Sequence, residues 1–428
     1  MTSSRDRLEA ALARIDDPKG EGARAIMTVY RDDARRAADA ADARARDGKS
    51  LGPLDGRIVT IKDLFDVAGE VTCAGSKLIQ SEGVVAKSDA PAIARLRAAG
   101  AVIAAKTTMV EFAFAAIGAN PHFGTPGNPA DRSRVPGGST SGGAVAVADG
   151  MCEITIGSDT GGSTRIPAAL CGIVGFKPSQ QRIPLQGAFP LSKTLDSIGP
   201  MAMTVADCAA ADAVMAGEAT TLPSLLLKNT RIGIATGMPV EQLDDIVAPA
   251  WDAAVRKLTA AAKATEVALP HLDGMAAVNA KGGLVPPEGF SVHRARYERA
   301  GKDIDPMIAA RFEKAAKIAP ADYDDMLRQR NDLAGKMDAF LSSFDAIAMP
   351  TCPIVAPTIA EVSDPHTFAR KNAMLLRNTS IGNFFNLTSI SLPLPGTRLP
   401  VGLMLIARND SDRKLFALAT EIEKLLAA

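Results

Sequence analysis

The sequence predicts an α/β sandwich built around a mixed, largely buried β-sheet. From Leu54 onward, short β-branched apolar runs alternate with helical stretches, and this alternation is typical of a sheet covered by helices. Of the 428 residues, 47% are hydrophobic and 22% are charged, which is enough apolar material for a large core. Large α/β enzymes often run to this length as one unit, so we expect a single domain over residues 1–428.

The first half of the chain predicts N-terminal helices within residues 1–50, which are rich in Ala and Arg, and then a strand–helix core over residues 54–205. Gly100 is a suitable stop for the helix before it, and Thr204 is a suitable N-cap for the helix after it. The expected strands of this core are 58–61, 101–105 and 153–156, and its expected helices are 90–99, 142–150 and 205–216.

The second half opens with an expected strand at 231–235 and a long helix at 240–262. Residues 270–343 differ, because we expect a loop over Gly282–Gly289 and then two helices, which together could form a mostly helical, cap-like segment. Residues 345–428 return to the sheet; the expected strands there are 345–349, 388–393 and 401–406, followed by an amphipathic helix at 415–426. The two helices of the cap-like segment are expected at 305–318 and 321–343.

Charge and composition argue against several functional classes. The chain carries 48 basic and 48 acidic residues, so its formal net charge is +0, and it shows no basic stripe of the kind that binds nucleic acid or anionic membranes. Aromatic residues make up only 4%, which argues against a stacking platform for single strands. No uninterrupted apolar stretch is long enough for a transmembrane helix, so we expect neither a nucleic-acid partner nor a membrane partner.

The five cysteines predict no metal cluster and no disulfide framework, because no two of them form a CxxC pair. An odd cysteine count in a large chain fits a reducing compartment, and the first residues lack an apolar signal core. We therefore expect a cytoplasmic protein without a bound metal.

Two serines in glycine-rich stretches are the candidate nucleophiles. Ser139 lies in Pro136–Gly143 and Ser163 lies in Gly157–Pro167. Acyl transfer needs an activated nucleophile, a base and hydrogen-bond donors for an oxyanion. The run from Asp159 to Ser163 would place bare backbone N–H donors beside a hydroxyl. Each stretch alone is more often a plain turn than a catalytic loop.

A lysine is the candidate base, because none of the four histidines lies in a motif and the GxSxG elbow is absent. Lys62 follows the strand-like run 58–61, so the start of its side chain is expected to be buried. Burial removes hydration from the ammonium, lowers its pKa and allows a neutral amine. The alternative is a lysine that reaches solvent at a strand end.

A phosphate-binding loop is a weaker interpretation. Gly100–Thr107 resembles a Walker A run, but Ala105 replaces the second glycine. The same segment has the pattern of a strand, whereas a phosphate-binding loop follows one, so a nucleotide site is disfavoured.

In combination, the lysine and the two serine stretches resemble the amidase signature family, including the 24-residue spacing between Ser139 and Ser163. The resemblance is strong over residues 54–205 and weaker at 349–353 and 399–403. Further segments that look like family landmarks are Thr72–Ser76, Lys106–Phe112, Gly175–Pro178 and Leu195–Pro200.

The resemblance implies a three-layer α/β/α fold and a Ser-Ser-Lys triad. Ser163 would be the acylated nucleophile, Ser139 the bridging serine after a cis peptide bond from Gly138, and Lys62 the base. No metal or organic cofactor would be needed. The backbone N–H groups that would bind the oxyanion are those of Thr160, Gly161, Gly162 and Ser163.

The resemblance also places candidate substrate-binding residues, whose apolar character favours an aryl or alkyl acyl group over a charged one. Thr108, Thr140 and Thr164 depart from the commonest family pattern, which bears on substrate preference more than on catalysis. The candidate pocket residues are Met109, Phe114, Ile117, Gly118, Phe189, Leu191 and Cys352.

The expected substrate is a small-molecule amide, anilide, urea or carbamate. One alternative is a glutamine-dependent amidotransferase subunit of the A type, for which the chain is short; others are a urethane or carbamate hydrolase and a scaffold without activity. The resemblance allows for a homodimer.

Overall fold

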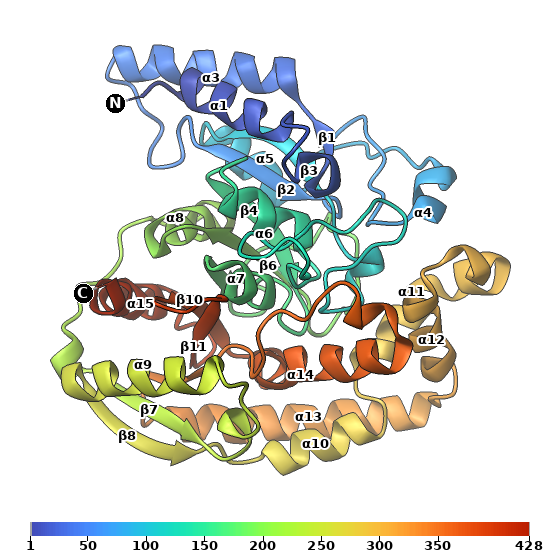
Figure 1. The fold of residues 1–428 in the computed structure, drawn as a ribbon, viewed down its shortest axis with the longest axis vertical. Coiled ribbons are helices and arrows are strands. Elements are labelled where there is room, and N and C mark those ends of the chain that lie inside the picture. Colours follow the sequence, from blue (N-terminus) through green and yellow to red (C-terminus); the bar gives the residue numbers. More distant parts are fainter. Residues whose placement is uncertain (1, 428) are drawn as a thin grey trace.

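A single 11-stranded sheet runs through the computed structural model, which describes residues 2–427 (Figure 1). The strand order is β1-β3-β2-β4-β6-β5-β10-β11-β9-β7-β8. The strands are β1 (Ile26–Val29), β2 (Ile58–Lys62), β3 (Val102–Thr107), β4 (Ile154–Asp159), β5 (Val174–Lys177), β6 (Ser197–Ala202), β7 (Arg231–Thr236), β8 (Lys263–Ala268), β9 (Ala346–Pro350), β10 (Thr388–Leu394) and β11 (Val401–Ala407).

The sheet is mixed, as the sequence predicts. β2 pairs in parallel with β3 and β4, and β7 pairs in parallel with β8 and β9. The pairs between these two groups, from β4 through β6, β5, β10 and β11 to β9, are antiparallel. Every residue of β2, β3 and β4 is buried, as expected for strands covered on both faces.

Helices cover both faces of this sheet (Figure 1). They are α1 (Ser4–Ile15), α2 (Gly22–Ala25), α3 (Arg31–Arg46), α4 (Lys77–Glu82), α5 (Pro91–Ala98), α6 (Ser141–Ala148), α7 (Arg165–Cys171), α8 (Val205–Ala216), α9 (Val247–Ala261), α10 (Leu272–Ala280), α11 (Val285–Ala300), α12 (Pro306–Ala315), α13 (Pro320–Leu341), α14 (Pro365–Phe384) and α15 (Asp412–Ala427).

Neighbouring residues of one strand pack into different hydrophobic clusters. Ile58 packs in a cluster with residues of α1, α3 and α6, whereas Val59 belongs to the cluster that contains residues of α5, α8 and α15. Val102 and Ile103 divide between the same two clusters. Because successive side chains of a strand point to opposite faces, this division defines a three-layer α/β/α sandwich.

Three parts of the sequence prediction are wrong. The helix predicted at 240–262 begins only at Val247, because residues 241–246 form bends and a turn in which the Asp244 N–H donates to the Pro353 carbonyl. Residues 26–29, predicted within the N-terminal helices, form β1, because Ile26, Thr28 and Val29 pair antiparallel with β3. Gly282–Gly289, predicted as a loop, contains the start of α11 at Val285. Pro286 and Pro287 lie in the first turn of that helix, where a missing N–H costs no hydrogen bond.

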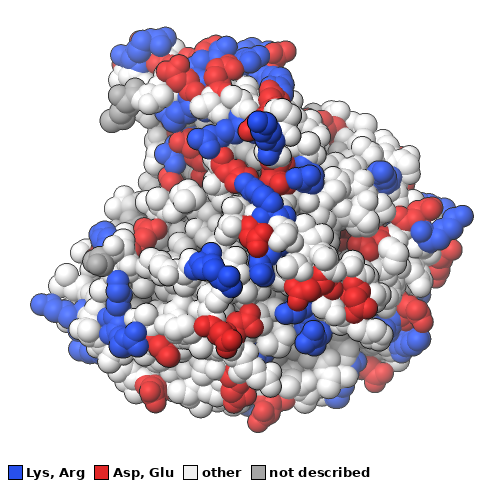
Figure 2. Space-filling model, in the orientation of Figure 1, with Lys and Arg blue, Asp and Glu red and all other residues white. Residues whose placement is uncertain are grey.

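Helices α10 to α13 account for the helical segment predicted over residues 270–343. α10 packs against α13 and α11 packs against α12, and in Figure 1 the second pair stands apart from the lower helices at one side. Basic and acidic side chains are interspersed over the face shown in Figure 2. Among residues 2–427, no helix has both the length and the apolarity needed to span a bilayer.

Candidate active site

Two adjacent parallel strands bring the candidate site together at their carboxyl ends. Lys62 is the last residue of β2, and Asp159 is the last residue of β4. The register pairs Ile61 with Ile156, so both strands end at the same edge of the sheet. The loops that follow such strand ends commonly carry functional groups, because the strands hold them in fixed positions.

Lys62 contacts Ser139 directly. The lysine Nζ lies 2.8 Å from Ser139 Oγ and 2.9 Å from Ser158 Oγ, and neither Lys62 nor Ser139 is exposed. The Gly138–Ser139 peptide bond is cis, as the family resemblance implies. The structure therefore joins two of the three predicted catalytic side chains by a hydrogen bond.

Burial dominates the titration of Lys62. Loss of hydration lowers the pKa of its amine to about 7, against the opposing charges of Asp159 and Asp196. Among residues 2–427 the hydrogen-bond partners of the lysine amine are two hydroxyls, those of Ser139 and Ser158, and no carboxylate lies within ion-pair distance. A substantial fraction of Lys62 is therefore neutral near pH 7.

Backbone hydrogen bonds hold the two serine segments against each other. The N–H of Thr140 donates to the carbonyl of Ser163 at 3.3 Å. The N–H of Val110 donates to the carbonyl of Ser139 at 3.1 Å, and Gly138 donates to Ala116 at 2.7 Å. Both serines are therefore fixed by main-chain contacts, and Ser163 keeps 6% of its surface exposed.

The loop between β4 and α7 presents free donors. Within residues 2–427, the backbone N–H groups of Thr160, Gly161, Gly162 and Ser163 donate to no protein acceptor. Gly162 has φ +138°, and a Cβ there would lie 2.3 Å from Thr379 Oγ1, so only glycine fits. Thr379 donates its hydroxyl hydrogen to the Gly161 carbonyl at 2.7 Å. The loop is thus held from α14 while its donors stay available.

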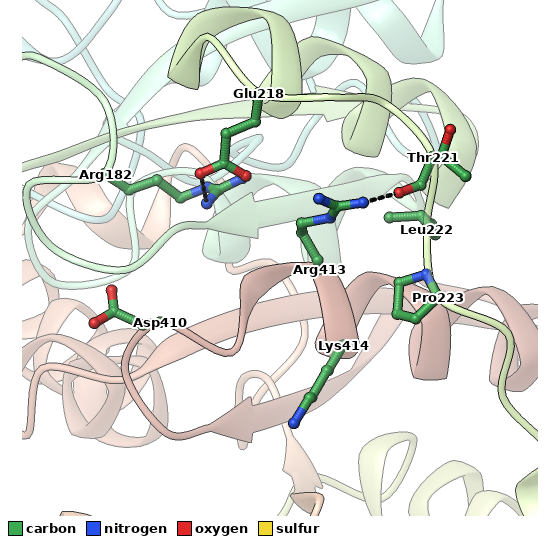
Figure 3. Close-up of a pocket in the computed structure, with 8 residues that line it drawn as sticks. All are labelled: Arg182, Glu218, Thr221, Leu222, Pro223, Asp410, Arg413 and Lys414. Atoms are coloured by element: carbon green, nitrogen blue, oxygen red, sulfur yellow. Dashed lines mark hydrogen bonds and ion pairs between the residues drawn. The ribbon is translucent and has the colours of Figure 1, made fainter.

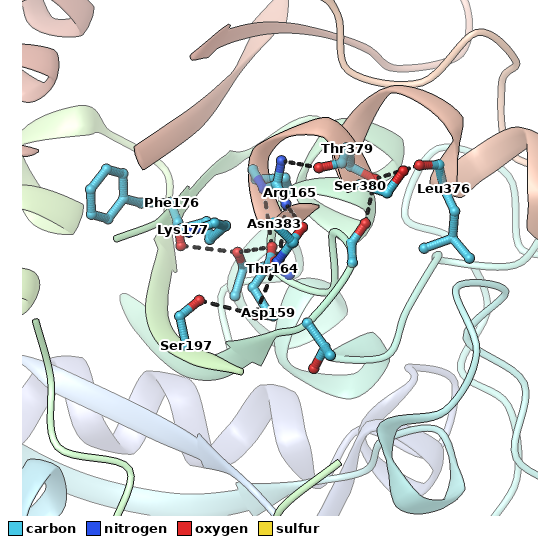
Figure 4. A network of polar contacts seen from close by, with 12 residues as sticks. Asp159, Thr164, Arg165, Phe176, Lys177, Ser197, Leu376, Thr379, Ser380 and Asn383 are labelled. Atoms are coloured by element: carbon cyan, nitrogen blue, oxygen red, sulfur yellow. Dashed lines mark hydrogen bonds and ion pairs between the residues drawn. The ribbon is translucent and has the colours of Figure 1, made fainter. Parts of the chain in front are cut away.

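A buried ion pair between Asp159 and Arg165 flanks this loop in the chain (Figure 4). Arg165 and Asp159 are 2.9 Å apart and neither side chain is exposed. Arg165 also donates to the Thr379 carbonyl at 2.8 Å and to Asn383 Oδ1 at 2.7 Å, and Asn383 donates back to Asp159 at 2.8 Å. The guanidinium beside Asp159 offsets its burial and holds the pKa of that carboxyl well below its usual range.

A second buried carboxylate lies on the other side of the loop. Thr160 Oγ1 donates to Asp196 Oδ1 at 2.6 Å. The N–H groups of Leu191 and Ser192 donate to the other oxygen of Asp196 at 2.9 and 3.0 Å. Burial raises the pKa of this carboxyl to about 6, although these hydrogen bonds favour the ionised form. Neither Asp159 nor Asp196 was singled out as a site residue from the sequence, although both lie in the motifs quoted there.

The predicted pocket residues are mostly buried near this site. Gly118 approaches the Gly137 carbonyl so closely that a Cβ would lie 2.4 Å from its oxygen. The Phe114 ring lies 5.4 Å from the Phe312 ring of α12, so helix α12 packs against this predicted pocket residue. Cys352 lies farther along the chain and donates its thiol hydrogen to the Leu375 carbonyl at 3.8 Å. Met109, Phe114, Ile117, Gly118, Leu191 and Cys352 are buried, and Phe189 is half-buried.

The three residues that depart from the family pattern have packing roles. Thr108 donates to the Arg24 carbonyl at 2.7 Å, and Thr164 donates to Asp159 at 2.9 Å. The methyl and hydroxyl of Thr140 fill the space beside Gly157, where a Cβ would lie 2.6 Å from Thr140 Oγ1. The predicted strand character of 101–105 is also confirmed, because β3 occupies the segment that resembles a Walker A run.

A surface pocket elsewhere holds groups that already pair with each other (Figure 3). Arg182 contacts Glu218 at 2.8 Å and Asp212 at 2.9 Å, and Arg413 donates to the Thr221 carbonyl. None of the predicted catalytic residues lines it.

The family model described as amidase matches residues 6–416. This chain belongs to the amidase signature family. It is a hydrolase of the amidase family, which acts on C–N bonds. A 2-amino-5-chloromuconic acid deaminase from Comamonas testosteroni is 34% identical to it over 405 residues, covering 92% of this chain and 86% of that protein. A 1-carboxybiuret hydrolase subunit from Pseudomonas sp. is 34% identical over 95% of this chain and 92% of that protein. The A subunit of the glutamyl-tRNA(Gln) amidotransferase from Anaeromyxobacter dehalogenans is 33% identical, over 99% of this chain and 93% of that subunit.

Solved structures agree with this membership. An amidase crystal structure superposes with a TM-score of 0.88 at 33% identity, covering 99% of this chain and 96% of the other. A peptide amidase in complex with the inhibitor chymostatin superposes with a TM-score of 0.84 at 28% identity, covering 100% of this chain and 95% of the other. The amidase fold therefore extends over the whole described chain.

Proposed function

We propose that this protein hydrolyses the C–N bond of a small-molecule amide through an acyl-enzyme on Ser163. The observation that carries the proposal is the contact between Lys62 Nζ and Ser139 Oγ at 2.8 Å, in a buried position where the pKa of the lysine falls to about 7. A neutral amine at that distance is a suitable general base.

The reaction proceeds in two halves. Neutral Lys62 takes the proton of Ser139 while Ser139 takes the proton of Ser163, and Ser163 Oγ attacks the carbonyl carbon. The free N–H donors from Thr160 to Ser163 bind the oxyanion. The proton returns through Ser139 to the leaving nitrogen as the C–N bond breaks. Water then attacks the ester carbonyl, gives its proton to the same relay, and releases the acid and free Ser163.

Two relatives direct the choice of substrates. The names of these relatives, 2-amino-5-chloromuconic acid deaminase and 1-carboxybiuret hydrolase subunit, both specify compounds that carry a carboxyl group. Small carboxylated amides therefore belong in a substrate panel beside neutral amides, anilides, ureas and carbamates.

An amidotransferase A subunit is the second candidate, because such a subunit aligns over 99% of this chain. It would use glutamine as ammonia donor and act only within a complex. Turnover of a small amide by the isolated protein would argue against it, whereas glutamine hydrolysis only after addition of partner subunits would favour it.

The test is turnover of that panel by the purified protein and by serine variants. We expect Ser163→Ala to abolish turnover and Ser139→Ala to reduce it heavily. Ser141→Ala is the matched control, since the Ser141 hydroxyl is buried and has no hydrogen-bond partner among residues 2–427. Full activity in Ser163→Ala would overturn the proposal. The single-domain organisation and a homodimer remain predictions, and sedimentation of the same protein would measure its oligomeric state.

A further inference from the structure

A buried carboxylate, that of Glu288, joins two helices to a loop near the candidate active site. Glu288 lies in the first turn of α11 and keeps 5% of its surface exposed. Its Oε2 accepts the Ser192 hydroxyl hydrogen at 2.6 Å and the Thr194 N–H at 3.1 Å. Its Oε1 accepts the hydroxyl hydrogens of Thr194 and of Tyr323 in α13, both at 2.7 Å. One side chain therefore links α11, α13 and the loop over residues 191–196.

Hydrogen bonds satisfy this carboxylate without a cation. Among residues 2–427 the partners of Glu288 are hydroxyl and amide groups, and no basic side chain lies within ion-pair distance. Hydrogen bonds to an ionised acceptor are about twice as strong as neutral ones. Burial and the bond to Glu288 raise the pKa of Tyr323, so its hydroxyl stays a donor. A buried polar network in which each group has a partner rigidifies the parts that it joins.

Ser192 contacts two carboxylates at once. Its hydroxyl donates to Glu288, and its N–H donates to Asp196 at 3.0 Å. The other oxygen of Asp196 accepts the hydroxyl hydrogen of Thr160 at 2.6 Å. Thr160 is the first residue of the donor loop, residues 160–163, whose backbone N–H groups have no acceptor among residues 2–427. A continuous series of hydrogen bonds therefore leads from α11 to the oxyanion donors.

Helix α11 also approaches this loop closely at the residue after Glu288. A Cβ at Gly289 would lie 3.0 Å from Leu191 Cδ1 and 3.5 Å from the Leu191 carbonyl oxygen. Glycine thus lets the backbone of the helix lie directly against the loop. Leu191 is a predicted pocket residue, and its N–H donates to Asp196 at 2.9 Å. The position of α11 therefore determines where the loop can hold Asp196.

Helix α13 has a second link to the donor loop, about two turns along from Tyr323. Arg330 donates to the last carbonyls of α14, including that of Asn383 at 3.2 Å. The Asn383 side chain contacts Asp159 at 2.8 Å and Arg165 at 2.7 Å, and these two residues precede and follow the donor loop. The helical segment is thus linked to the donor loop by two separate routes.

We propose that Glu288 is a positioning residue for the oxyanion donors, because it holds the loop over residues 191–196 where Asp196 can orient Thr160. This inference rests on the proposed function. The hydrogen bonds of Glu288, and not its charge, give the effect. A glutamine can replace it, because an amide accepts through its oxygen and donates to hydroxyls through its nitrogen. A methionine at the same position leaves the donors unpaired.

The test measures how fast a fluorophosphonate phosphonylates Ser163, a reaction that uses the oxyanion donors and needs no known substrate. Glu288→Met should lower the rate constant by about 10- to 100-fold, the effect of a small displacement of catalytic groups. Glu288→Gln should recover most of this loss. The matched control is Glu82→Gln, which breaks ion pairs between α4 and the same helix α11 and should react at the wild-type rate. Equal rates in Glu288→Met and wild type, or equal losses in Glu288→Met and Glu288→Gln, would overturn the inference.

A double-mutant cycle separates positioning from a general loss of packing. If Glu288 acts through Thr160, the effect of Glu288→Met should shrink to less than about threefold in a Thr160→Val background. The same factor in both backgrounds would contradict the inference. Where Glu288→Met does not fold, Ser192→Ala/Thr194→Val removes two of the hydroxyl donors, leaves both helices intact and enters the same cycle. A wild type that is not labelled at Ser163 would refute the proposed function as well, whereas equal labelling of wild type and all variants would refute this inference alone.

Discussion

Thr160 donates its hydroxyl hydrogen to Asp196 Oδ1 at 2.6 Å, which fixes one end of the donor loop to a buried carboxylate. The other oxygen of Asp196 accepts the N–H groups of Leu191 and Ser192. The charge of Asp196 also raises the pKa of Lys62. One carboxylate thus orients the loop, holds a wall of the predicted pocket and acts on the candidate base.

The pH dependence of kcat/KM should report the neutral form of Lys62. Because burial lowers the pKa of this amine to about 7, we expect kcat/KM to rise about tenfold per pH unit below 7 and to level off above it. Steady-state kinetics from pH 5 to pH 9 would measure this limb. A flat profile across neutral pH would show that Lys62 is not the base.

Asp196→Asn should move the rising part of the kcat/KM profile to lower pH. The negative charge of Asp196 raises the pKa of Lys62, so its removal leaves burial less opposed. Thr160→Val is the matched control, since it removes the hydrogen bond to Asp196 and keeps the carboxylate. The control should lose activity without the shift. If kcat/KM rises over the same pH range in Asp196→Asn as in wild type, the charge of Asp196 does not raise the pKa of Lys62.

Lys62→Met should change how stability depends on pH. The folded pKa of about 7 lies below the unfolded value, so between pH 7 and pH 10 the unfolded state binds more protons. In that window Lys62 makes wild-type stability increase with pH by about 1.4 kcal/mol per pH unit, and Lys62→Met should lack this increment. Urea unfolding at several pH values would measure the difference. The exposed Lys336→Met serves as control, and an identical slope in Lys62→Met and wild type would contradict the pKa assignment.

Arg165→Met should destabilise the fold by about 3–5 kcal/mol, because it leaves the buried Asp159 without its charge partner. The double variant Asp159→Asn/Arg165→Met should recover part of this loss, since no lone buried charge remains. Urea denaturation would compare the three proteins. A double variant no more stable than Arg165→Met would argue against an unpaired charge as the cause.

Gly162→Ala should reduce kcat by at least about tenfold, since the added Cβ collides with Thr379 Oγ1 and displaces the donor loop. Gly335→Ala is the matched control, because Gly335 is exposed in α13 and a Cβ there meets no atom within 4 Å. Turnover of the best substrate in the panel would be compared. Equal activity of the two variants would show that the loop conformation is not needed.

The sequence predicted best those features that are encoded locally. The alternation of strands and helices predicted the sheet core, and the contact between Lys62 and Ser139 agrees with the motif-based pairing. The strand at 26–29 was missed because its pairing with β3 is a tertiary contact between residues far apart in the chain. The start of α11 was missed because two prolines and two glycines obscure a helix that tolerates proline in its first turn.

Asp196 could not be identified from the sequence for a different reason. It acts through partners that lie far from it in the chain, namely Thr160 and Lys62.

The most direct test of the account is the site of covalent modification by a serine-directed fluorophosphonate. Peptide mapping by mass spectrometry should locate a single adduct on Ser163, absent from Ser163→Ala and slowed in Lys62→Met because the base is lost. Ser141→Ala should be modified at the wild-type rate. An adduct on Ser139 or elsewhere, or unchanged labelling of Ser163→Ala, would contradict Ser163 as the nucleophile.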